Sequence, residues 1–121
     1  MEQMEDNISF MKDFKPLDEE EFAAVWKVCD IFKRQDLIAC TFCKYCTEGC
    51  PMQISIPDLF SDMNCLRRYV GWNGEWHYNM HTTDRGKASD CIQCGLCETA
   101  CPQHLPIREL LVNVAEVFEA K

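Results

Sequence analysis

Eight cysteines of this 121-residue chain fall into two copies of one motif, C-x2-C-x2-C-x3-C-P. Three thiolates at three-residue spacing can turn inward around one cubane cluster from a short coiled loop, and the motif is the one that bacterial ferredoxins use for [4Fe–4S] clusters. Pro51 and Pro102 close the copies and are expected to turn the chain away from the clusters. The cysteines of the two copies are Cys40, Cys43, Cys46 and Cys50, and Cys91, Cys94, Cys97 and Cys101.

The fourth cysteine of each motif is expected to serve the other cluster. Three closely spaced thiolates reach three irons of a cube, and the remaining iron faces away from their loop. In two-cluster ferredoxins the last cysteine of each motif therefore ligates the other cluster. The prediction gives one [4Fe–4S] cluster to Cys40, Cys43, Cys46 and Cys101, and a second to Cys91, Cys94, Cys97 and Cys50. Gly49 and Gly95 are expected to let the backbone approach the inorganic sulfides.

Zinc and disulfides are the other common uses of clustered cysteines. Zinc takes four thiolates tetrahedrally, but a zinc knuckle uses two separated CxxC pairs and would leave the third cysteine of each motif unused. The N-terminus has no basic region followed by an apolar core, as a signal peptide would. A cytoplasmic location is therefore expected, where lasting disulfides are rare. The two cysteines outside the motifs, Cys29 and Cys65, are expected to be buried core thiols.

The other residue types predict little chemistry. The three histidines, His77, His81 and His104, do not have the spacing of a metal triad. The three tryptophans, Trp26, Trp72 and Trp76, are expected to be core and packing residues. No phosphate loop, nucleophile–base pair or paired carboxylates occur, so no catalytic residue is predicted. The formal net charge of −8 argues against nucleic acid as a partner, and no stretch reaches the roughly 20 apolar residues of a membrane span. The negative charge could steer a basic redox partner.

Periodicity predicts an all-α fold, because runs of alternating β-branched residues are nearly absent. A helix is expected over residues 18–35, where Asp18 and Glu21 have the spacing of a capping box. A second helix is expected over 56–70, with Pro57 in its first turn, and a third over 105–120. Residues 71–88 are rich in glycine and aromatic side chains and are expected to form a loop with at most one helical turn. Residues 1–16 are polar and are expected to form a linker or a truncated end.

The residues around the two motifs resemble those of a known protein family. The stretches CTFCKYCTEGCPMQISIPDLF, ASDCIQCGLCETACPQHLPIRELL and EQMEDNISFMKDFKPLDEEE resemble the C-terminal part of the iron–sulfur-containing aldo/keto reductases, and the similarity covers essentially the whole chain. The resemblance implies an α-helical ferredoxin-like domain at residues 17–121 that carries two [4Fe–4S] clusters. It also implies that residues 1–16 are the end of a preceding (β/α)8 barrel and its linker. The catalytic residues and nicotinamide site of that barrel have no counterpart here.

Electron transfer through the two clusters is the function expected from these observations, with a redox partner or the preceding barrel of the same chain as the second party. Two other roles fit the same cysteines. A metal can simply staple a small domain into a structural or interaction module, or clusters that fall apart in oxygen can serve as a sensor. Reduction of the clusters at an accessible potential separates the first role from the staple.

Overall fold

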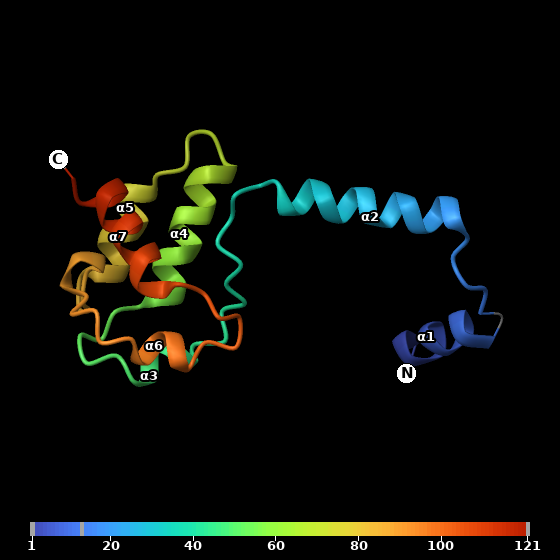
Figure 1. Ribbon diagram of the computed structural model, residues 1–121, viewed down its shortest axis with the longest axis horizontal. Helices are drawn as coiled ribbons and strands as arrows, with labels where there is room; N and C mark the ends of the chain where they lie inside the picture. Colours follow the sequence, from blue (N-terminus) through green and yellow to red (C-terminus); the bar gives the residue numbers. More distant parts are fainter. Residues whose placement is uncertain (1, 13, 121) are drawn as a thin grey trace. The chain divides into compact units, whose positions relative to one another are not determined.

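The computed structural model describes residues 2–12 and 14–120 (Figure 1). It divides the chain into two compact units, Met1–Asp36 and Leu37–Lys121. Within the described ranges every regular element is a helix, which confirms the all-α prediction. None of the described helices combines the length and the apolar character needed to cross a bilayer.

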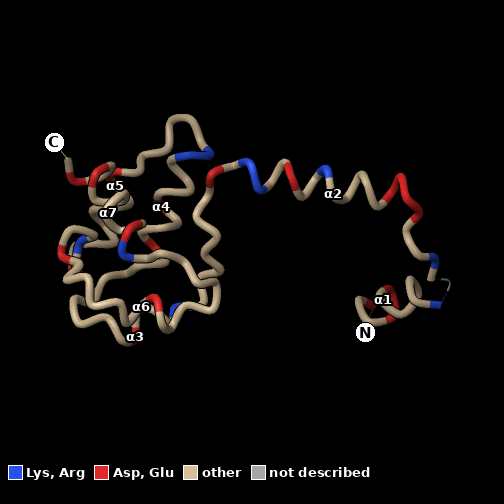
Figure 2. The backbone as a smooth tube through the Cα atoms, viewed as in Figure 1, with Lys and Arg blue, Asp and Glu red and all other residues tan. Residues whose placement is uncertain are grey.

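The first unit contains helices α1 (Glu2–Lys12) and α2 (Glu19–Lys33). Helix α1 occupies a stretch whose polar composition had predicted a linker. The N-terminus of α2 is the predicted capping box: the Asp18 carboxylate accepts a hydrogen bond from the Glu21 amide at 2.9 Å, and the Glu21 carboxylate accepts one from the Asp18 amide at 3.0 Å. Acidic residues open α2 and Lys33 lies in its last turn (Figure 2), which suits the helix dipole.

The apolar face of α2 is not a core face within the described residues. No residue of α2 is buried, and Phe22 and Trp26 each keep 53% of their surface exposed. Cys29 lies on this face and is half-buried, so its prediction as a buried core thiol is wrong. The predicted helix is confirmed, but the periodicity of its apolar residues cannot say what that face packs against.

The second unit is built on three longer helices, α4 (Ile56–Arg68), α5 (Gly74–Thr82) and α7 (Ile107–Phe118). Helix α4 packs against α5 and α7, and the one-turn helices α3 (Tyr45–Glu48) and α6 (Leu96–Thr99) lie together at the other end of the unit (Figure 1). A 3₁₀ turn, η1 (Ala88–Asp90), precedes the second motif. The predicted helices at 56–70 and 105–120 are confirmed, including Pro57 in the first turn of α4.

Helix α5 corrects the prediction of a loop over residues 71–88. The Asn73 side chain caps it by accepting a hydrogen bond from the Trp76 amide at 3.3 Å. Tyr78 is 2% exposed and its ring stacks on Phe118 at 4.9 Å between centroids. Burial of this large ring contributes about 1.5–3 kcal/mol, so tertiary packing holds a helix that its glycine-rich composition did not indicate.

The second unit contains an internal repeat with the offset that separates Cys40 from Cys91. Both copies run from a cysteine loop through a one-turn helix into a long helix, α3 then α4 and α6 then α7. Their left-handed backbone positions correspond: φ is 60° at Phe42 and Gln93, and 52° and 51° at Gln53 and His104. The sequence had shown this repeat only in its cysteines.

Candidate metal centre

The eight motif cysteines gather around two hollows of the second unit. The first hollow is lined by Cys40, Cys43, Cys46 and Cys101, and the second by Cys50, Cys91, Cys94 and Cys97. Their empty volumes are nearly equal, about 320 and 330 Å³. Each hollow therefore takes three cysteines from one motif and the last cysteine from the other. Among the described residues, no three Cys, His, Asp or Glu side chains form a site for a single metal ion.

Apolar side chains from the long helices form the walls of both hollows. Ile56 at the start of α4 is 1% exposed and lines both of them. Phe60 of α4 lines the first hollow and Leu111 of α7 lines the second, and both are almost fully buried. The hollows thus share a wall, and the core covers them on that side, whereas Cys43 and Cys94 in their linings are exposed.

Three of the thiols in the hollows, Cys40, Cys46 and Cys97, have raised pKa values. Burial raises the pKa of Cys46 and of Cys97 from 9.0 to about 11, and neighbouring motif thiols add to the rise. Burial likewise raises the pKa of Cys40, and the negative charges that Cys43 and Cys101 would carry raise it further. Four thiolates are therefore stable in such a space only around a cationic centre. Metal binding must release protons from these thiols.

A side-chain amide holds the segment that leads into the first motif. The Asn64 side chain on α4 accepts a hydrogen bond from the Ile38 amide at 2.8 Å and donates one to the Ile38 carbonyl at 2.9 Å. Ile38 is 6% exposed and precedes Cys40 by two residues. This pair of bonds ties the entry of the first cysteine loop to the helix that walls the first hollow.

Asn64→Ala is expected to lower the free energy of unfolding by about 1–3 kcal/mol, because it leaves a largely buried backbone donor and acceptor without their partners. Loss of the tie should also speed release of iron from the first hollow. Thermal unfolding and the rate of iron capture by a chelator measure the two effects. Asn113→Ala, at an exposed position on α7, is the control; equal behaviour of the two variants would contradict this role.

A carboxylate holds the corresponding point of the second motif. Ser89 also lies two residues before its cysteine, and Glu119 accepts hydrogen bonds from the Ser89 amide at 3.0 Å and from the Ser89 hydroxyl. Glu119 accepts a third bond from the Tyr78 hydroxyl at 2.5 Å. Burial alone would raise the pKa of Glu119, but these donors outweigh it and hold that pKa below 4.5.

Several predictions outside the motifs need correction. Trp26 and Trp76 are exposed by 53% and 57% and are not core residues, whereas Trp72 is half-buried and stacks on His77 at 4.2 Å. His81 contacts the buried carboxylate of Asp62 at 2.8 Å, a pair that spacing did not indicate because its members lie on different helices. Burial raises the pKa of Asp62, and the His81 contact opposes that rise.

Two further positions differ from expectation. Cys65 is half-buried, so its prediction as a fully buried thiol is wrong, and it lines a surface hollow beside Cys40. Gly49 has a φ of −95° and open space where a Cβ would lie, so its backbone does not require glycine. Gly95 does adopt a left-handed conformation, with φ of 80°, and the equivalent residue of the first copy is Lys44 at 66°.

The donor set fits two iron–sulfur clusters, because each hollow offers four sulfurs within an apolar wall and no competing carboxylate lines either one. Residues 39–105, more than half of the chain, match the family model described as a 4Fe-4S dicluster domain. No curated protein and no solved structure matches the chain. Both motifs lie within the matched residues. The chain belongs to the 4Fe-4S dicluster domain family, and its cofactors are two [4Fe–4S] clusters.

Proposed function

We propose that this chain transfers electrons through its two clusters, with Cys40, Cys43, Cys46 and Cys101 holding the first and Cys91, Cys94, Cys97 and Cys50 holding the second. The observation that carries this proposal is the crossed lining of the two hollows, in which each motif contributes its last cysteine to the other site. The family supports iron–sulfur electron transfer in general. When bound, [4Fe–4S] clusters accept and release single electrons at potentials set by their surroundings.

The residues of the chain have three tasks in this function. The cysteines give up their protons and hold the irons as thiolates. Ile56, Phe60 and Leu111 exclude water from the hollows, which lowers the local dielectric and limits loss of iron. Cys43 and Cys94 are the exposed cysteines of their motifs, so they mark the places where each centre comes nearest to the solvent and to a redox partner.

The parent protein is proposed to be an aldo/keto-reductase-like oxidoreductase whose barrel precedes residues 17–121. The sequence resemblance supports this, and so does the surface of the first unit. Helices α1 and α2 have no buried residue and carry many exposed apolar side chains, a feature that can mark an interaction surface. They include Ile8, Phe10, Met11, Phe22, Val25, Trp26, Ile31 and Phe32. A preceding barrel would supply the surface that covers them.

The test is the iron and acid-labile sulfide content of the anaerobically purified or reconstituted chain, with a spectrum before and after dithionite. We expect about eight irons and eight sulfides per chain, and a broad brown absorbance that bleaches on reduction. Zinc without sulfide after anaerobic reconstitution would reject the proposal. Clusters that are present but resist reduction at every accessible potential would instead favour the metal-stapled structural module.

A further inference from the structure

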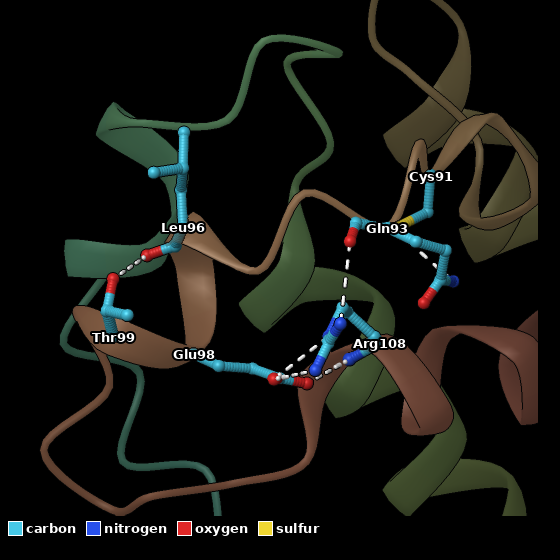
Figure 3. Close-up of polar contacts among 6 residues, drawn as sticks. All are labelled: Cys91, Gln93, Leu96, Glu98, Thr99 and Arg108. Carbon is cyan, nitrogen blue, oxygen red and sulfur yellow. Dashed lines mark hydrogen bonds and ion pairs between the residues drawn. The ribbon is translucent and has the colours of Figure 1, made fainter.

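The second cluster site has a side-chain hydrogen bond to a ligand sulfur. The Gln93 side-chain amide lies 3.8 Å from the Cys91 sulfur and donates a hydrogen bond to it (Figure 3). The equivalent residue of the first copy is Phe42, whose side chain has no donor, although its backbone amide donates a hydrogen bond to the Cys40 sulfur. Both residues have φ of 60° and both are exposed. The backbone is thus the same at the two positions, and the side chain makes the difference.

Arg108 fixes the backbone of Gln93. Its Nη1 donates to the Gln93 carbonyl at 3.5 Å, and its Nε and Nη2 each contact the Glu98 carboxylate at 2.9 Å (Figure 3). The Glu98 carboxylate also accepts a hydrogen bond from the Arg108 amide at 2.9 Å. Glu98 therefore balances the charge of Arg108 and orients it. In the first copy the position of Arg108 is taken by Pro57, which cannot form such a contact.

Hydrogen bonds to the sulfurs raise the reduction potential of an iron–sulfur cluster, because they stabilise the more negative reduced state. We propose that Gln93 raises the potential of the second cluster above that of the first, so that an electron entering the chain comes to rest on the second. In this internal step the first cluster loses one electron and the second gains it, and no proton or further reagent is consumed. The inference rests on the proposed function, because it requires Cys91 to be a ligand.

Lys44 has the opposite effect on the two potentials, because it favours reduction of the first cluster. It lines the first hollow, and a cation there favours reduction of the first cluster. Lys44 is exposed, however, and its ammonium lies over the Phe42 ring at 5.0 Å from the centroid. Salt screens an exposed charge over about 8–10 Å, whereas the Gln93 amide contacts a sulfur directly. The hydrogen bond from Gln93 is therefore expected to decide which cluster has the higher reduction potential.

The experiment is an anaerobic redox titration of the whole chain, reduced with dithionite and followed by absorbance and electron paramagnetic resonance. Two one-electron waves are expected. Gln93→Met keeps the size of the side chain but removes the donor. It should lower the potential of the higher wave by at least about 59 mV, which is a tenfold change in the equilibrium distribution of the electron between the two clusters. Phe42→Gln should raise the lower wave. Gln53→Met is the matched control, because Gln53 is also exposed and left-handed, and it should move neither wave.

Arg108 is tested as a positioning residue through the same potential. If Arg108 acts through Gln93, then Arg108→Gln should lower the potential of the higher wave in the wild-type chain. In the Gln93→Met chain the same change should lower that potential little further, because two changes that act through one contact are not additive. Equal shifts in both chains would show that Arg108 does not act through Gln93.

Three results would overturn the inference. Gln93→Met could leave both waves in place, or it could move the lower wave. Lys44→Gln could shift the potential of the first cluster by more than Gln93→Met shifts that of the second. In each case about eight irons and sulfides per chain would still support the proposed function. A chain that holds no iron and sulfide after reconstitution would overturn both proposals together.

Discussion

Cys101→Ser is expected to remove the cluster of the first hollow, although Cys101 belongs to the second motif. Its sulfur lines that hollow with Cys40, Cys43 and Cys46, so serine would leave one iron without a thiolate. Iron should fall from about eight to about four per chain, since each cluster holds four. The cluster proposed for Cys91, Cys94 and Cys97 should remain, because Cys50 lines the same hollow and is proposed as its fourth ligand. Iron and sulfide analysis after anaerobic reconstitution measures the change.

Double variants show which cysteines share a cluster. Cys40→Ser combined with Cys101→Ser should lose no more iron than either change alone, because both act on one cluster. Cys91→Ser combined with Cys101→Ser should lose nearly all of it. Cys29→Ser, on α2 and outside both motifs, is the control and should keep all eight irons. The crossed assignment is wrong if Cys101→Ser adds to Cys40→Ser but not to Cys91→Ser.

The grouping of the cysteines could be anticipated from the sequence because it depends on local spacing. Each motif turns three sulfurs toward one side of a loop, and ferredoxin chemistry then requires a fourth sulfur from elsewhere. The structure gathers the cysteines in the same two groups of four, while their ligation remains a prediction. Helices α4 and α7 were predictable for a similar reason, since their apolar residues recur at helical intervals over several turns.

Features that depend on contacts between distant segments could not be predicted. The packing of Tyr78 against Phe118 makes α5 a helix, and these residues are far apart in the chain. The contact between Asp62 and His81 joins α4 to α5, and the contact between Glu98 and Arg108 joins α6 to α7. For the two polar pairs, the residue types alone favoured ordinary surface positions.

The left-handed backbone positions were not predicted from the sequence. Gly95 was expected only to let the backbone approach the sulfides, and its φ is 80°. Its counterpart Lys44 adopts the same conformation with a side chain that disfavours it, and Phe42 and Gln93 do likewise. The cysteine loop imposes these angles, so the repeat in the backbone is more regular than the repeat in the sequence. The motif spacing makes Phe42 and Gln93 equivalent in the sequence, and the structure adds that both have a φ of 60°.

Ile56→Ala is expected to weaken both cluster sites at once. Ile56 is 1% exposed and is a wall of both hollows, so its truncation leaves a cavity that adjoins each of them. Loss of the buried side chain should cost about 2–5 kcal/mol of unfolding free energy, a large part of the roughly 5–15 kcal/mol that a domain has. Water admitted to the cavity should speed release of all eight irons to a chelator.

Two neighbouring changes separate this effect from general destabilisation. Phe60→Ala should cost about 3–5 kcal/mol but speed release mainly from the first hollow, and Leu111→Ala should act mainly on the second. Each site can be followed alone, the first in a Cys91→Ser chain and the second in a Cys101→Ser chain. Val117→Ala, at a position 49% exposed on α7, should stay within about 0.5 kcal/mol of the parent. If Phe60→Ala and Leu111→Ala speed release equally from both sites, the rates report overall stability, and the walls do not protect the two clusters separately.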